Sequence, residues 1–185
     1  PVIPRAIDNA PTVQADAIGS GSASFGVVAD IITTGFNAAD ELTNANTSFS
    51  VLLWATGGQN GSGATYLVGD GTTSPGRFYM RIESDNTDLR MGVGGSSATL
   101  TTSNPYDSSQ WNHCAFIYDA SGNTGKIYVN GIQEISVAVS DSDAYPDQNV
   151  VLGYNNGGNS FIGKMAQLGI WDAVLTQAQI QSIME

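Results

Sequence analysis

Short β-rich runs separated by turn residues are the feature that most constrains this fold. From about residue 25 onward, runs of Val, Ile, Leu, Phe, Tyr and Thr alternate with clusters of Gly, Asn, Asp and Ser, without helices between them. Strands at this spacing are typical of an antiparallel sandwich or barrel. We therefore expect an all-β fold with two antiparallel sheets, whose strands fall near residues 49–56, 64–70, 76–84, 89–95, 98–103, 113–119, 126–131, 133–140, 149–155 and 164–172.

The two ends of the chain differ from this pattern. Residues 1–24 hold three of the six prolines, which predicts an extended N-terminal arm with a short edge strand near 12–18. At the other end, Thr176 and Gln179 form a capping box, and Leu175 with Ile180 fits a hydrophobic staple. These signals predict a short C-terminal helix. We expect its apolar stripe to pack on the sandwich, and presentation of the stripe to a partner is the alternative.

The charge balance narrows the class of ligand. The chain has six Lys and Arg residues and 17 Asp and Glu residues, so its net charge is −11. Because a basic patch is not evident, we expect neither nucleic-acid binding nor attraction to an anionic membrane. No apolar run approaches the length of a transmembrane helix, and the first residues, PVIPRAIDNAP, lack the pattern of a signal peptide. Carboxylate and amide oxygens are abundant, which permits calcium binding.

Residues 111–119, WNHCAFIYD, hold the only histidine and the only cysteine. Such a pair could indicate a metal site or a catalytic dyad. Neighbouring strand residues point to opposite faces, however, so His113 and Cys114 cannot act together. Both faces of this run are mainly apolar, which predicts a central strand covered on both sides. The following Asn130–Gly131 pair predicts a tight hairpin, so that residues 111–140 form a three-stranded meander.

Several of these segments, taken in order, resemble one protein family. They are TSFSVLLW at 47–54, WNHCAFIYDASG at 111–122, IYVNG at 127–131, VVLGY at 150–154 and FIGKMAQLGIWDAVLTQAQI at 161–180. The set resembles the laminin-G-like and pentraxin group of concanavalin A-like jelly rolls, over residues 25–185. The resemblance implies a two-sheet antiparallel jelly-roll sandwich with a C-terminal helix, often glycan-binding, often calcium-dependent and sometimes purely structural. We therefore divide the chain into an arm, 1–24, and one jelly-roll domain, 25–185.

The chain departs from the pentraxin pattern in two places. Pentraxins pair the cysteine of the HC strand with a cysteine on the early strand, and the matching position here is Leu52, so the resemblance implies that Cys114 is a free buried thiol. Pentraxins also carry an acidic calcium-binding run after LG, where this chain has Tyr154, Asn155 and Asn156. Amide oxygens can ligate calcium, but a site without the carboxylates would be weak or absent.

Candidate ligand sites fall mainly on loops. Residues 140–149 could hold calcium through their carboxylates, and a solvated acidic loop is the alternative. Tyrosine rings at strand ends and in loops could stack on sugars, although each also suits ordinary packing. The calcium candidates are Asp141, Asp143 and Asp147, and the glycan candidates are Tyr145, Tyr154, Asn155 and Asn156. Three further rings with the same alternatives are Tyr66, Tyr79 and Tyr106.

One string is similar to the carboxylate motif of glycosidases that share this fold. In ESDNTD the acids are Glu83, Asp85 and Asp88, and only the first two would share a strand face because residues 86–88 read as a turn. No other motif supports catalysis, so we expect a protein that is not an enzyme.

These observations leave three functional hypotheses. The first is a non-enzymatic module for surface binding or assembly, most simply a bacteriophage decoration or fibre protein on the virion surface. Its arm would contact neighbouring virion subunits, it would form a closed homo-oligomer, and it could bind a cell-surface glycan. The second is a carbohydrate-binding lectin module of a secreted multidomain protein. The third is a glycoside hydrolase.

Overall fold

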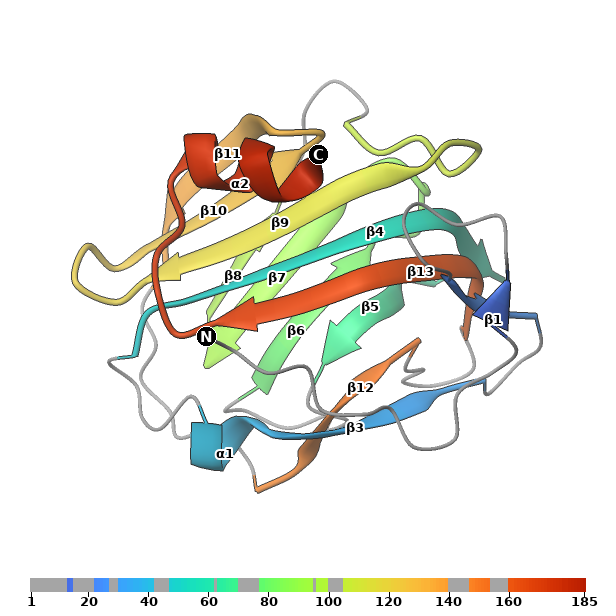
Figure 1. Ribbon diagram of the computed structural model, residues 1–185, viewed down its shortest axis with the longest axis horizontal. Helices are drawn as coiled ribbons and strands as arrows, with labels where there is room; N and C mark the ends of the chain where they lie inside the picture. Colours follow the sequence, from blue (N-terminus) through green and yellow to red (C-terminus); the bar gives the residue numbers. More distant parts are fainter. Residues whose placement is uncertain are drawn as a thin grey trace.

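The computed structural model is a sandwich of two antiparallel sheets (Figure 1). It describes residues 13–14, 22–26, 30–41, 47–61, 63–69, 77–94, 96–99, 105–139, 147–153 and 160–185. The seven-stranded sheet contains, in spatial order, β1 (Val13–Gln14), β2 (Ser22–Phe25), β13 (Ser160–Trp171), β4 (Phe49–Asn60), β9 (Asn112–Asp119), β10 (Thr124–Val129) and β11 (Ile132–Ala138). The six-stranded sheet contains β3 (Ile32–Asn37), β12 (Asn149–Leu152), β5 (Thr65–Gly69), β6 (Arg77–Ile82), β7 (Leu89–Gly94) and β8 (Ser96–Thr99).

Each of the ten predicted runs overlaps a strand, and the all-β, two-sheet prediction is confirmed. The sequence pattern missed β2 and β3, because SASF and ITTGFN are rich in small and polar residues. The expected edge strand near 12–18 is β1, whose Val13 pairs with Ala23 of β2. The predicted boundary between arm and domain, after residue 24, falls within β2.

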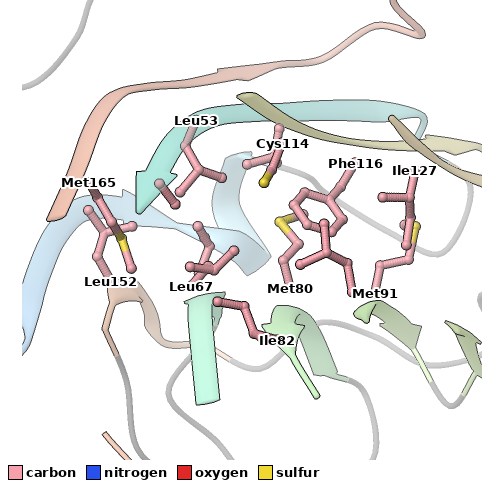
Figure 2. Close-up of a cluster of buried hydrophobic side chains, with 14 of the residues drawn as sticks. Leu53, Leu67, Met80, Ile82, Met91, Cys114, Phe116, Ile127, Leu152 and Met165 are labelled. Carbon is pink, nitrogen blue, oxygen red and sulfur yellow. The ribbon is translucent and has the colours of Figure 1, made fainter. Parts of the chain in front are cut away.

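The main core lies between the sheets and is built by alternation along the strands. Leu53 of β4 and Cys114 and Phe116 of β9 point towards Met80 of β6 and Met91 of β7 (Figure 2). All five side chains are fully buried. Because alternate residues of a strand point to opposite faces, the intervening residues of β4 and β9 form a second, outer layer.

That outer layer is covered by α2 (Gln177–Met184), which Figure 1 shows lying across β9 and β10. Ile180 of α2 is fully buried there, and the capping box between Thr176 and Gln179 is present as predicted. The central strand is therefore covered on both faces, as expected. The buried members of this second cluster are Leu52, Ala115, Ile117, Tyr128, Leu175 and Ile180. No helix in the described ranges is long and apolar enough to cross a membrane.

The predicted meander is also confirmed, since β9, β10 and β11 are consecutive neighbours. Asn130 and Gly131 both adopt positive φ, of 50° and 76°, as a two-residue hairpin turn requires. The carbonyl of Gly131 accepts hydrogen bonds from the side-chain amides of Gln177 and Gln181, at 2.9 and 3.0 Å. The hairpin thereby fixes the position of α2.

The early-strand residue that faces the cysteine differs from the prediction by one position. Leu53, not Leu52, lies opposite Cys114, whereas Leu52 lies opposite Ala115 on the α2 side. A shift of one residue along a strand moves a side chain to the other face of the sheet. The prediction of a free buried thiol holds, because Cys114 is unpaired and fully buried.

Candidate functional site

The outer face of the six-stranded sheet gathers tyrosine and charged side chains from three neighbouring strands. Tyr66 of β5 lies opposite Arg81 of β6, which in turn lies opposite Arg90 of β7. Two residues along β6, Tyr79 lies opposite Gly92 of β7. The residues between them, such as Met80, point into the core, so these side chains share the opposite face.

The guanidinium of Arg81 lies against two aromatic rings. The rings of Tyr66 and Tyr79 meet edge to face, with centroids 5.4 Å apart and an interplanar angle of 72°. The Cζ atom of Arg81 is 5.9 Å from the ring centroid of Tyr66 and 5.4 Å from that of Tyr79. Both distances are within the range of cation–π attraction. The nearly buried rings of Tyr66 and Tyr79 therefore form a floor beneath Arg81 and restrain its guanidinium.

The position of the Tyr79 ring in this floor depends on Gly92 of the neighbouring strand. A Cβ atom at Gly92 would lie 2.1 Å from Cε1 of Tyr79, so the Tyr79 ring occupies the space that a side chain at position 92 would need. Glycine within a strand often marks such a close approach.

Glu83 links the two arginines. The Nε–H of Arg81 donates to Oε1 of Glu83 at 2.8 Å, and Nη1 of Arg90 is 3.8 Å from the same oxygen. The side chains of Arg81, Glu83 and Arg90 are 18%, 21% and 31% exposed, so all three reach the surface. Burial lowers the pKa of Arg81, but hydrogen bonds with Glu83 and Tyr66 outweigh it and hold the pKa above its ordinary value. We call Tyr66, Tyr79, Arg81, Glu83 and Arg90 the Tyr–Arg cluster.

The carboxylates of the glycosidase-like string have local structural partners. Glu83 is engaged by Arg81, as above, while Asp85 accepts the backbone N–H groups of Thr87 and Asp88, both at 2.9 Å. Partial burial raises the pKa of Asp85, but these hydrogen bonds outweigh it and bring the pKa below its ordinary value. The predicted turn is present, with Asn86 at a φ of 61°. Asp85 therefore closes the turn between β6 and β7.

An open surface pocket of about 340 Å³ lies beside this turn. The side-chain oxygen of Asn86 accepts the backbone N–H of Gln59 at 3.0 Å, and the Tyr106 hydroxyl donates to the carbonyl of Gly57 at 2.8 Å. Both bonds attach the pocket wall to β4. Tyr106 is only 1% exposed, so its ring is a packing element and not a stacking surface. The lining residues are Asp85, Asn86, Thr87, Tyr106, Asp107 and Ser108.

Of the seven predicted loop candidates, Asp147 lies in the described part of the chain. Asp147 is described: it is exposed, and one of its carboxylate oxygens accepts a hydrogen bond from Nδ2 of Asn37 at 2.7 Å. This bond joins the end of β3 to the residues before β12. Within the described ranges, no group of three or more His, Cys, Asp or Glu residues could hold a metal ion. The candidates that lie outside the described residues are Asp141, Asp143, Tyr145, Tyr154, Asn155 and Asn156.

His113 and Cys114 point to opposite faces, as predicted. His113 packs edge-on against Trp54 with ring centroids 5.2 Å apart, whereas Cys114 lies in the main core. Burial lowers the pKa of His113 to about 4 and raises that of Cys114 far above its ordinary value. Both groups are therefore neutral near pH 7.

Tyr66 and Tyr79 were predicted as candidate rings from the sequence, whereas Arg81 and Arg90 were not. A usable signal exists in RFYMRIES, where Tyr79, Arg81 and Glu83 alternate along one strand face. Arg90 could not be added, because its place beside Arg81 depends on the β6–β7 register.

Comparison with known proteins identifies relatives of this chain. The model of the family described as the concanavalin A-like lectin/glucanases superfamily matches residues 32–181. A rat protein, the sushi, von Willebrand factor type A, EGF and pentraxin domain-containing protein 1, is 25% identical over 126 residues. That alignment covers 60% of this chain and 4% of the rat protein, so the chain corresponds to a small part of it.

Two examples represent the solved structures that share the fold. Domain 4 of AbnA, a GH43 extracellular arabinanase from Geobacillus stearothermophilus solved with arabinotriose, has a TM-score of 0.70 at 22% identity. The match covers 94% of this chain and 82% of that domain. The CBM40 of the Ruminococcus gnavus IT-sialidase, solved with α2,3-sialyllactose, has a TM-score of 0.62 at 16% identity, covering 89% and 96% of the two chains. At these identities the likeness concerns the fold alone.

Proposed function

Because this chain belongs to the concanavalin A-like lectin/glucanases superfamily, we propose that it is a non-enzymatic glycan-binding module whose binding face is the Tyr–Arg cluster. The observation that carries the proposal is a guanidinium fixed by two tyrosine rings and a carboxylate on an outer sheet face. Two solved structures that share this fold, one with arabinotriose and one with α2,3-sialyllactose, support a glycan as the ligand class.

The chemistry of the Tyr–Arg cluster suits a sugar. Guanidinium N–H groups donate to sugar oxygens, and the Glu83 carboxylate accepts from sugar hydroxyls. The ion pair with Glu83 and the two rings hold Arg81 in one place before a ligand arrives. Pre-arranged side chains lose less conformational entropy on binding, which favours affinity.

A glycan array tests the proposal with three forms of the full chain. We expect the wild type to bind at least one glycan. Arg81→Ala should weaken that binding about tenfold or more, because it removes hydrogen bonds from a charged donor. The matched control is Lys126→Gln, which removes one positive charge from β10 in the other sheet. Absence of binding, or equal loss in both variants, would contradict the proposal.

The loop candidates remain a separate proposal. Tyr145, Tyr154, Asn155 and Asn156 would extend the glycan contact, and Asp141, Asp143 and Asp147 would bind calcium. The same array, read with and without a chelator, tests the calcium site. An equal glycan-binding signal with and without the chelator would argue against the calcium site.

A proposal more specific than glycan binding alone is that the module assembles on a virion surface. It is supported by an N-terminal segment that adds to a sheet edge, where β1 pairs with β2. In that setting the arm would contact neighbouring subunits, and a closed homo-oligomer would multiply weak glycan contacts. A secreted multidomain protein is the alternative setting. It is supported by the similar fold of domain 4 of an extracellular arabinanase.

A further inference from the structure

We infer that the pocket beside the β6–β7 turn is a second binding site, one that takes a single uncharged sugar residue. The Tyr–Arg cluster lies on the outer face of the six-stranded sheet, whereas this pocket lies at the ends of β6 and β7, next to the end of β4. The inference therefore goes beyond the proposed function and can fail independently of it. The features that carry it are the size of the pocket, its fixed walls and its hydrogen-bonding groups.

Two chain segments form the walls of the pocket, and main-chain hydrogen bonds hold them in place. One segment is the β6–β7 turn and the other is residues 106–108. The N–H of Tyr106 donates to the carbonyl of Thr87 at 3.2 Å, and the N–H of Gly57 donates to the carbonyl of Ser108 at 2.8 Å. The volume of about 340 Å³ is within the range of small-molecule sites. Because the walls are fixed before a ligand arrives, binding costs less conformational entropy.

The lining residues offer both acceptors and donors. Oδ1 of Asp107 accepts two hydrogen bonds from Ser109, which leaves Oδ2 without a partner among the described residues. Asn86 accepts the N–H of Gln59 through its side-chain oxygen, so the N–H donors of Nδ2 are available. Ser108 is held through its carbonyl oxygen, so its hydroxyl is available as well. A sugar hydroxyl both donates and accepts, so adjacent hydroxyls of one sugar match this mixture.

The charge of the pocket disfavours anionic sugars. Hydrogen bonds from the hydroxyl and the backbone N–H of Ser109 lower the pKa of Asp107. Partial burial raises the pKa of Asp85, but hydrogen bonds hold it below its ordinary value too. Both carboxylates are therefore charged near pH 7, and none of the six lining residues is basic. A sugar with a carboxylate would be repelled. A simple cation would be attracted, but it would leave the amide donors of Asn86 unmatched.

An NMR titration of the full chain with monosaccharides tests the second site. The panel pairs neutral sugars with their uronic acids, such as glucose with glucuronate and galactose with galacturonate, at millimolar concentrations. We expect at least one neutral sugar to shift the ¹H–¹⁵N amide signals of residues 85–87 and 106–108 in a saturable way. Its uronic acid should bind roughly five- to tenfold more weakly at low salt, because like charges lie in the pocket lining.

Asp107→Ala removes an acceptor from the pocket, and Asp119→Ala is its matched control. Asp119, at the end of β9, accepts the same pair of bonds from Ser121, at 3.1 and 2.7 Å, that Asp107 accepts from Ser109, at 2.9 and 2.7 Å. Both variants lose these turn-stabilising bonds, but only Asp107→Ala should weaken sugar binding at the pocket, about fivefold or more. If Asp107→Ala proves unstable in a thermal melt, Ser108→Ala should show the same effect, because the bonds to its carbonyl remain.

The position of the shifts separates this inference from the proposed function. Absence of pocket shifts for every neutral sugar, tighter pocket binding of the uronic acids, or equal binding by Asp107→Ala and Asp119→Ala would overturn the inference and leave the proposed function intact. Shifts confined to the pocket would support the inference and contradict the proposed binding face at the Tyr–Arg cluster.

Discussion

At the residue scale, neighbouring side chains decide what each group can do. Arg81 is positioned by two rings and a carboxylate, whereas the buried His113 has lost the protonation behaviour of a free imidazole. The local sequence could suggest the arrangement around Arg81, because Tyr79, Arg81 and Glu83 alternate along one strand. It could not suggest Arg90 or Gly92, which join the arrangement through strand pairing.

Substituting Gly92 tests the floor of the Tyr–Arg cluster. Gly92→Ala places a Cβ 2.1 Å from the Tyr79 ring, so the ring must move and its contact with Arg81 is lost. We expect a lower melting temperature and weaker glycan binding. Gly26→Ala is the matched control, because nothing lies within 4 Å of its Cβ. Equal behaviour of the two variants in melting and binding would contradict this account.

His113 predicts a pH dependence of stability. Burial lowers its pKa from 6.5 to about 4, so as the pH falls between these values the unfolded chain takes up a proton that the folded chain does not. The free energy of unfolding should therefore decrease as the pH falls through this window, by up to roughly 3 kcal/mol from this group. Urea denaturation at pH 7 and pH 4.5 would measure it.

The comparison for that measurement is His113→Gln, which removes the titrating group. The wild type should lose more stability than the variant between the two pH values. An equal loss in both proteins would show that carboxylates, and not His113, govern the acid response.

At the element scale, most strands could be predicted and their register could not. Runs such as FSVLLWAT and HCAFIYD have strong apolar patterns, whereas SASF and ITTGFN do not, which is why β2 and β3 were missed. The capping box, the Asn-Gly hairpin and the meander could be predicted because they depend on local sequence. The position opposite Cys114 depends on how β4 pairs with β9, and there the prediction was one residue off.

An engineered disulfide tests this register. Leu53→Cys should form a disulfide with Cys114 on oxidation, because directly opposed residues of antiparallel strands have Cα atoms within about 4.5–5.5 Å. Leu52→Cys should not, since its side chain points to the α2 face. Thiol titration in denaturant would find no free thiol in the first variant and two in the second. The reverse result would place Leu52 opposite Cys114.

At the scale of the whole molecule, the two outer faces of the sandwich differ. The seven-stranded sheet is covered by α2, which buries Leu52, Ile117 and Ile180 in an apolar layer. The six-stranded sheet carries charged groups and tyrosine rings on its outer face. The fold class could be predicted from strand spacing and the resemblance, but the binding face could not, because it is assembled from residues on β5, β6 and β7.

The assembly proposal makes its own prediction at this scale. Native mass spectrometry should find a closed homo-oligomer for the full chain, and a smaller species when residues 1–12, which precede β1, are removed. A monomer in both cases, at micromolar concentration, would contradict the proposed arm contacts.

The central claim is that a glycan binds the outer face of the six-stranded sheet. The most direct measurement is a ¹H–¹⁵N NMR titration of the full chain with the glycan that binds most strongly on the array. The account predicts that the largest amide shifts fall on β5, β6 and β7, around Tyr66, Arg81 and Arg90. Shifts confined to α2 and the β10–β11 hairpin, with β6 and β7 unchanged, would contradict it.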